Sequence, residues 1–316
     1  MHDTTRLKGI LAPVVTPFKA DLSSAPERFI AHCRWLLSQH VGLAVFGTNS
    51  EANSQSVSER MELLEALVAA GLDTTRMMPG TGCCALTDTV RLTAHAVQLG
   101  CAGVLMLPPF YYKDVSDEGL YRTLSDIIQR VGDARLRIYL YHIPPVAVVG
   151  ISLPLIERLL KAYPGTMAGI KDSSGNWSNT KAMLDAFATA GFDVFVGSET
   201  FLLANMRHGG AGCISATANV NPAPIHALYA AWQDAAAEVQ QAKLNIVRDV
   251  FGKKYTMIAA LKQAIAHFGD DPIWATVRPP LLPLSADQTA AFITELQQIG
   301  FTMPGLRRAC TQAVAS

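Results

Sequence analysis

Residues 168–175 have the sequence Ala168-Gly169-Ile170-Lys171-Asp172-Ser173-Ser174-Gly175. An apolar run that begins at Met167 ends on Lys171, and small polar residues follow at once. This pattern is typical of a buried strand that passes into a loop. A lysine amine kept neutral by a buried setting attacks ketones and forms Schiff bases. The alternative is a structural lysine that extends to water or pairs with Asp172.

The rest of the chain repeats an alternation of strand and helix. Short apolar strands are predicted at residues 11–18, 41–46, 77–81, 101–107, 137–140, 167–170, 192–196 and 212–215. Helices are predicted at residues 26–39, 56–70, 87–99, 117–130, 152–161, 178–190 and 200–208. Strands that are apolar throughout are typical of a parallel sheet buried on both faces. Eight strands that alternate with helices predict an α/β fold of the (β/α)8 TIM barrel type.

Capping residues define several of these helices. Ser56, Thr87 and Ser152 are predicted N-caps in the barrel, and Ser285 opens the last long helix with Gln288 three residues later. The chain after residue 216 is rich in Ala, Leu and Gln and is predicted to be helical. Because no linker interrupts it, we expect a barrel over residues 1–220 and a C-terminal helical layer over residues 221–316, packed together as one structural unit.

Composition limits the possible partners and compartment. The 316 residues carry a formal net charge of +0, so no basic field attracts nucleic acid or an anionic membrane. No secretory leader and no run of about 18 apolar residues is present, and we expect a soluble, cytoplasmic protein. The cysteines lack C-x-x-C spacing and are expected to be reduced core thiols. They are Cys33, Cys83, Cys84, Cys101, Cys213 and Cys310.

Polar side chains gather where the predicted strands end, which is where barrel enzymes carry their chemistry. The residues at these ends are Thr48, Asn49, Tyr111, Tyr112, Tyr141, Lys171, Ser198 and Glu199. No Asp, Glu and His set suited to a metal is among them. Tyr141 ends the strand before the lysine strand, so its phenol can move protons for imine chemistry, or alternatively only fill the barrel top.

The loop over residues 47–51 has the sequence Gly47-Thr48-Asn49-Ser50-Glu51. A glycine turn followed by polar residues can present N–H groups and side-chain donors to an anion. The alternative is a hydrogen-bonded loop in which Glu51 is a local brace. A carboxylate-binding loop facing a lysine is what a 2-keto acid requires, since its carboxylate is held while its ketone meets the amine.

A second glycine-containing turn, residues 80–85, matches G-x-G-x-x-A after a strand. A dinucleotide site would also need an acidic residue about 20 positions on, at the next strand end. Leu107-Pro108-Pro109 stands there instead, which favours a tight turn of the barrel. His142 is the one histidine at a predicted strand end, and a supporting role is expected for it.

Together these segments resemble the dihydrodipicolinate synthase / N-acetylneuraminate lyase family of Schiff-base class I aldolases, over about residues 8–300. Residues 47–51 resemble its G-[TS]-T-G-E loop, residues 140–144 its Y-N-x-P segment, and residues 169–175 its G-x-K-D-x-S-G lysine motif. Residues 197–199 and 209–215 resemble its last two strand ends.

The resemblance implies roles for individual residues. Lys171 would form the Schiff base, Tyr141 would shuttle protons, and Thr48 would link Tyr141 to a tyrosine of a neighbouring subunit. That tyrosine is expected to be Tyr111, with Tyr112 as the alternative. Substrate-binding residues would be Gly47, Asn49, Ser50, Gly197, Ser198, Glu199 and Ile214. The family is usually a homotetramer built from two tight dimers.

Two departures from the family pattern bear on the substrate. Asn49 and Ser50 replace the second Thr and the Gly of the loop, and an Asn side chain can still donate to a carboxylate. Val146 stands where lysine-pathway members carry an Arg, so an anionic aldehyde lacks a bidentate partner there. A sugar-like, apolar or aromatic aldehyde is therefore expected, and the lysine-pathway synthase is not.

These observations predict a lyase that acts on pyruvate or a related 2-keto acid and makes or breaks a C–C bond with an aldehyde. It would need no metal or organic cofactor. A 2-keto-3-deoxy sugar acid dehydratase is the alternative enzyme. A non-catalytic protein that binds 2-keto acids, and a barrel without a keto-acid site, are the alternatives of another class.

Overall fold

The computed structural model describes residues 6–307. These residues form two compact units. The lysine unit comprises residues 6–9 and 73–214, and the loop unit comprises residues 10–72 and 215–307. The first contains Lys171, and the second contains the loop over residues 47–51.

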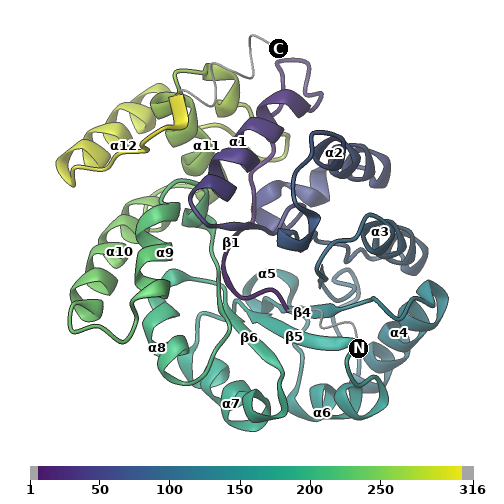
Figure 1. The fold of residues 1–316 in the computed structure, drawn as a ribbon. Helices are drawn as coiled ribbons and strands as arrows, with labels where there is room; N and C mark the ends of the chain where they lie inside the picture. The colour runs from purple at the N-terminus through teal and green to yellow at the C-terminus, as the bar shows by residue number, and fades with distance from the viewer. Residues whose placement is uncertain (1–5, 308–316) are drawn as a thin grey trace. The chain divides into compact units, whose positions relative to one another are not determined.

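Parallel strands form the centre of the lysine unit. They follow one another in the order β3 (Val104–Met106), β4 (Ile138–His142), β5 (Met167–Asp172), β6 (Asp193–Val196) and β7 (Gly212–Ile214). Figure 1 shows β4, β5 and β6 side by side. Every residue of these strands is buried, as expected for parallel strands that are covered on both faces.

Helices separate these strands along the chain. They are α3 (Leu86–Gln98), α4 (Asp117–Val131), α5 (Pro144–Ala147), α6 (Leu153–Ala162), α7 (Trp177–Phe187) and α8 (Leu202–Arg207). The Ser152 hydroxyl accepts the Leu155 N–H at 3.1 Å, which confirms the predicted cap of α6. The predicted cap at Thr87 is wrong, because α3 begins at Leu86 without a side-chain cap.

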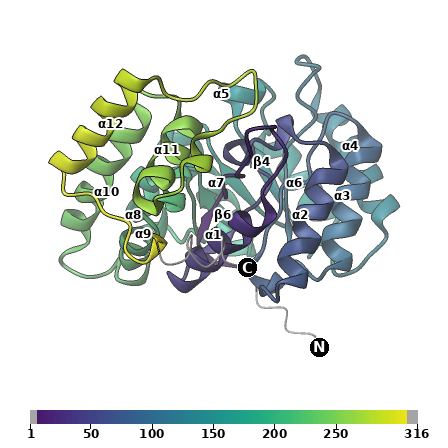
Figure 2. The same ribbon diagram turned by 90° about the horizontal axis from the view of Figure 1, so that it is seen from above.

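The loop unit contains a short parallel pair of strands and most of the C-terminal helices. Leu11 and Ala12 of β1 (Gly9–Ala12) pair with Gly42 and Leu43 of β2 (Gly42–Leu43). The helices are α1 (Pro26–Ser38), α2 (Val57–Ala69), α9 (Pro222–Ala230), α10 (Ala237–Gly252), α11 (Met257–Gly269) and α12 (Ala286–Gln298). Helices α10, α11 and α12 pack against one another (Figure 2). The predicted capping boxes at Ser56 and Ser285 are both confirmed.

The third predicted strand, over residues 77–81, is reduced to a single bridge between Gly80 and Leu105. Residues 6–307 therefore contain seven strands instead of the eight expected. Pro79 lies in the middle of this run and has no N–H to donate to a ladder, although its carbonyl accepts the Leu105 N–H at 2.9 Å. The lysine strand is longer than predicted, since β5 continues through Asp172.

Close packing requires glycine at positions 169 and 82. A Cβ on Gly169 would lie 2.3 Å from the Asp193 carbonyl oxygen and 2.8 Å from the Tyr139 ring. A Cβ on Gly82 would lie 2.3 Å from the Leu107 carbonyl oxygen. Gly82, in the segment 80–85, thus serves close backbone packing.

The cysteines follow the expectation only in part. Cys33 and Cys213 are buried, and burial raises the pKa of Cys33. Cys84 is exposed, contrary to the prediction of a core thiol, because it lies in the turn that precedes α3. Cys310 lies outside the described residues.

Candidate active site

The side chains of Lys171 and Tyr141 lie against each other in the lysine unit. The two residues are partners across β5 and β4, so their side chains point to the same face. The Lys171 Nζ lies 4.2 Å from the centroid of the Tyr141 ring. Lys171 is 2% exposed and Tyr141 is 4% exposed. The structure thus brings the two central predicted residues together in a buried setting, and Lys171 does not extend to water.

Asp172 has its own set of hydrogen-bond donors. Its side chain lies on the opposite face of β5 from that of Lys171, because successive strand residues alternate. The carboxylate accepts the hydroxyl of Thr180 at 2.6 Å, the amide of Asn179 at 3.2 Å and the N–H of Ser174 at 2.9 Å. Asp172 therefore ties the end of β5 to the start of α7, and a Lys171–Asp172 ion pair is not the arrangement found.

His142 follows Tyr141 and supports the segment after β4. Its Nδ1 accepts the Ile151 N–H at 3.0 Å, which requires that this nitrogen carry no proton. Burial lowers the pKa of His142, and the nearby Asp172 carboxylate opposes that shift. The ring is therefore held as a neutral acceptor at neutral pH, in the supporting role expected from the sequence.

Four predicted substrate-binding residues lie at the ends of β6 and β7. Gly197, Ser198 and Glu199 follow β6, and Ile214 is the last residue of β7. The Gly197 N–H donates to the Asp172 carbonyl at 2.7 Å, and a Cβ on Gly197 would lie 2.0 Å from the Ser173 hydroxyl. The Ser198 hydroxyl accepts the Thr200 N–H at 3.3 Å. Glu199 and Ile214 are both buried. Gly197 is thus fixed by packing against the segment that follows the lysine.

An exposed aromatic pair follows β3. The rings of Tyr111 and Tyr112 meet edge to face, with centroids 5.3 Å apart, and both side chains are exposed. The Lys113 Nζ donates to the Ala147 carbonyl at 3.2 Å and to the Phe110 carbonyl, which ties this loop to the end of α5.

An apolar cavity of about 380 Å³ lies behind this aromatic loop. Met106, Pro109, Tyr112 and Leu140 are among its lining residues, whereas Lys171 and Tyr141 are not. The cavity therefore does not contain the chemistry expected of the lysine.

Helix α5 was missed by the sequence analysis. Its signal is the Pro144-Pro145 pair at the first helical positions. Val146 and Val148 are each 61% exposed, and Val148 has a φ of 58°, which is strained for a β-branched residue. Val146 is thus an exposed apolar side chain of α5.

The predicted carboxylate-binding loop lies in the loop unit. Thr48–Ser50 forms one turn of 3₁₀ helix, and the Gly47 N–H donates to the Ser50 hydroxyl at 3.1 Å. Ser50 is buried, and Thr48 and Asn49 are half-buried. Ser50 therefore closes the loop with its own side chain.

Lys262 is a buried charge that the sequence analysis missed. Its Nζ lies 2.6 Å from the Glu51 Oε1, and both side chains are 0% exposed. Burial lowers the pKa of Lys262 to about 8, although Glu51 opposes the shift. The available signal was a single lysine among the apolar residues of α11.

Neither a metal site nor a membrane span is found in the described part of the chain. Residues 6–307 contain no group of three or more His, Cys, Asp or Glu side chains suited to a metal ion. No helix among them is both long and apolar enough to cross a membrane.

An α/β chain with a buried lysine and tyrosine on adjoining parallel strands has the architecture of the enzymes that carry their chemistry at strand ends. A family model described as the dihydrodipicolinate synthetase family matches residues 6–299, and the chain belongs to this family. Its members are lyases of the class I aldolase type, and this chain is an enzyme of that class.

Three known proteins illustrate the similarity. An uncharacterized DapA-like lyase of Chloroflexus aurantiacus is 34% identical over 298 residues, which cover 92% of this chain and 97% of that protein. The crystal structure of dihydrodipicolinate synthase from Agrobacterium tumefaciens is 31% identical, with a TM-score of 0.84 over 93% of this chain and 99% of that chain. YagE from E. coli K12, solved in complex with pyruvate, is 26% identical with a TM-score of 0.84 over the same shares.

Proposed function

We propose that this chain is a Schiff-base-forming lyase that acts on pyruvate or a related 2-keto acid and makes or breaks a C–C bond with an aldehyde. The observation that carries the proposal is the Lys171 amine, buried and 4.2 Å from the Tyr141 ring centroid. The YagE structure, which holds pyruvate, supports the choice of keto acid.

The reaction uses the chain's own residues. The Lys171 Nζ attacks the ketone, Tyr141 moves the protons, and loss of water leaves an iminium. The iminium accepts the electron pair when a proton leaves the adjacent carbon or when a C–C bond breaks, and an enamine results. The enamine then adds to an aldehyde, or takes up a proton and releases pyruvate after hydrolysis. Neither step requires a metal or an organic cofactor.

The remaining predicted residues complete the proposal. Backbone groups of Thr48 and Asn49 bind the carboxylate, and Thr48 links Tyr141 to Tyr111 of a neighbouring subunit. The other substrate-binding residues are Gly47, Ser50, Gly197, Ser198, Glu199 and Ile214. The proposal includes a closed barrel with a C-terminal helical layer, a homotetramer made of two dimers, and a cytoplasmic location.

The aldehyde partner is proposed to be uncharged. Val146 is an exposed apolar side chain where lysine-pathway members carry an Arg, so α5 offers no bidentate partner to an anionic aldehyde at that position. A sugar-like, apolar or aromatic aldehyde meets no desolvated charge there. The lysine-pathway synthase is therefore not the proposed activity.

Exchange of the methyl hydrogens of pyruvate in D₂O tests the proposal without knowledge of the aldehyde, because exchange requires the enamine. The wild-type chain should catalyse it, Lys171→Ala should abolish it, and Tyr141→Phe should slow it by about 10²–10⁴-fold. Failure to exchange any 2-keto acid would refute the proposal. Exchange confined to longer keto acids, with no pyruvate released from sugar-acid substrates, would indicate the dehydratase instead.

A further inference from the structure

Glu51 has an unusual backbone conformation and a carboxylate whose two oxygens both accept hydrogen bonds. It lies between the 3₁₀ turns Thr48–Ser50 and Ala52–Ser54 with a φ of 56°, a left-handed conformation that is uncommon for residues other than glycine. Its Oε1 accepts the Lys262 Nζ at 2.6 Å, and its Oε2 accepts the Arg278 backbone N–H at 2.9 Å. Two segments far along the chain therefore fix the end of the candidate carboxylate-binding loop.

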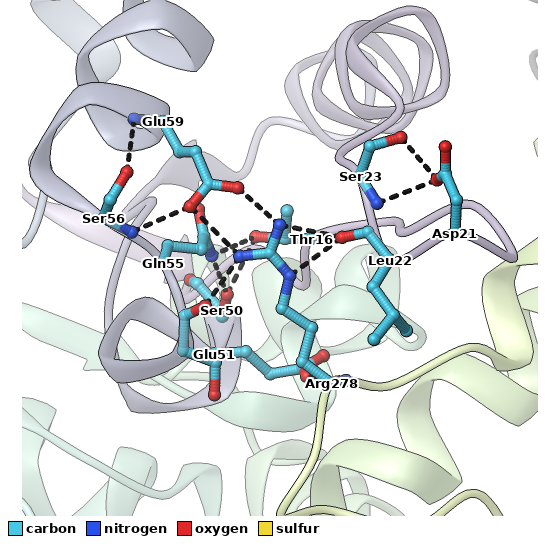
Figure 3. Close-up of polar contacts among 11 residues, drawn as sticks. Thr16, Asp21, Leu22, Ser23, Ser50, Glu51, Gln55, Ser56, Glu59 and Arg278 are labelled. Atoms are coloured by element: carbon cyan, nitrogen blue, oxygen red, sulfur yellow. Dashed lines mark hydrogen bonds and ion pairs between the residues drawn. The ribbon is translucent and has the colours of Figure 1, made fainter.

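The guanidinium of Arg278 extends this network to the segments on either side of the loop (Figure 3). It donates to the Ser54 carbonyl at 2.6 Å, to the Leu22 carbonyl at 2.8 and 3.0 Å, and to both carboxylate oxygens of Glu59. All five of its N–H groups are thereby used. The side chain joins the turn that follows the loop, the turn at Leu22 and the first turn of α2 into one assembly.

Two further hydrogen bonds hold the backbone carbonyl of Ser50 in the loop. The Ser50 carbonyl accepts the Thr16 hydroxyl at 2.8 Å and the Gln55 amide at 2.7 Å. The ring of Phe18 lies 4.5 Å from the Lys262 Nζ and 4.3 Å from the Arg278 Cζ, measured to its centroid. Two cations thus share one buried aromatic ring beneath the loop.

A buried ion pair is weak evidence of a contribution to stability, since apolar residues of similar volume often serve as well. Such pairs are better explained where they impose one conformation on a segment. Here the segment is the loop whose backbone at Thr48 and Asn49 is proposed to bind the substrate's carboxylate.

We propose that Lys262 is a positioning residue that acts through Glu51, whose other carboxylate oxygen is held by the Arg278 backbone N–H, and that it fixes the backbone of Thr48 and Asn49 for recognition of the 2-keto acid's carboxylate. This inference rests on the proposed function. It makes the ion pair a determinant of the preference for a carboxylate over a neutral group on the same ketone, distinct from the chemistry at Lys171.

The test compares two ketones by borohydride trapping on Lys171. Pyruvate carries the carboxylate, and pyruvamide has the same ketone with a neutral amide in its place. The measured quantity is the ratio of the concentrations of the two probes that give half-maximal adduct. For the Lys262→Met/Glu51→Gln double variant, the wild-type preference for pyruvate should fall by about tenfold or more, the size of one charge-assisted hydrogen bond.

Glu51→Gln alone is the gentler second variant. It keeps the shape of the side chain, and it removes the Glu51 charge that opposes the lowered pKa of Lys262, so the buried amine can give up its proton. The preference of this variant for pyruvate over pyruvamide should fall in the same direction. In the exchange of pyruvate's methyl hydrogens, its KM for the keto acid should rise while kcat stays nearly unchanged. Lys243→Met removes an exposed lysine of α10 and is the matched control, for which no change is expected.

The inference is overturned if the variants keep the wild-type ratio of half-maximal concentrations for pyruvate and pyruvamide. This holds whether both adducts persist or both decline, because a purely structural brace affects the two probes equally. If the wild-type chain forms no adduct on Lys171 with any 2-keto acid, the proposed function fails and this inference with it. A lost preference in folded variants that still trap pyruvamide on Lys171 supports it.

Discussion

The buried pair of Lys262 and Glu51 predicts a large difference between single and double substitutions. Lys262→Met leaves the Glu51 carboxylate, whose side chain is 0% exposed, without its ammonium partner, while the Arg278 backbone N–H still donates to Oε2. Removal of one partner of a buried pair lowers the free energy of unfolding by about 3–5 kcal/mol. Since Glu51→Gln also removes the stranded charge, the double variant should recover much of that loss.

The assay is a double-mutant cycle from urea unfolding at pH 7, with wild type, Lys262→Met, Glu51→Gln and the double variant. We expect a coupling free energy of about 1–3 kcal/mol, as for residues in direct contact. Lys243→Met is the control for removal of a lysine that is exposed, and its effect should stay within about 0.5 kcal/mol. Strict additivity of the two single changes would refute the ion pair.

The pH dependence of the same pair has a definite sign. Burial lowers the pKa of Lys262 from 10.5 to about 8, so between these values the unfolded chain binds more protons than the folded one. The wild type should therefore gain stability relative to the double variant as pH rises from 8 to 10.5. A flat difference between the two over that range would contradict the account of the buried amine.

Three further changes test other parts of the structure. Hydrogen bonds from Arg278 lower the pKa of Glu59 from 4.5 to about 2, so the stability that Glu59 contributes is present above pH 4.5 and is lost towards pH 2; acid unfolding of Glu59→Gln should lack this component. Val148→Gly should raise the unfolding free energy by about 1 kcal/mol, because it relieves a φ of 58° at an exposed side chain, and a loss measured by thermal unfolding would show that the valine has another role. Gly169→Ala should cost about 1–3 kcal/mol or more, because its Cβ would meet the Asp193 carbonyl oxygen at 2.3 Å, and an unchanged melting temperature would argue against this packing.

Local signals predicted the helices well. Ser56, Ser152 and Ser285 act through residues three positions away, so their caps depend on little beyond the neighbouring sequence. Strand lengths depend on partners elsewhere in the chain. Residues 77–81 pair at a single bridge, and residues 41–46 pair only at Gly42–Leu43.

The candidate site was predictable where it follows from strand order. Consecutive parallel strands bring their carboxyl ends together, and this is why Tyr141 and Lys171 were expected to be neighbours. The contact of Glu51 with Lys262 spans 211 positions of sequence and follows from no local pattern. A brace role for Glu51 was foreseen as an alternative to ligand binding, whereas its partner was not.

The measurement that tests the central claim most directly is borohydride reduction with pyruvate, followed by peptide mass spectrometry. The account predicts one reduced pyruvyl adduct, on the peptide that contains Lys171, and its absence in Lys171→Ala. Lys262, which is buried like Lys171 and has a pKa lowered to about 8, serves as an internal comparison and should stay unmodified. An adduct on Lys262, or no adduct with pyruvate or any longer 2-keto acid, would contradict the assignment of Lys171 as the Schiff-base residue.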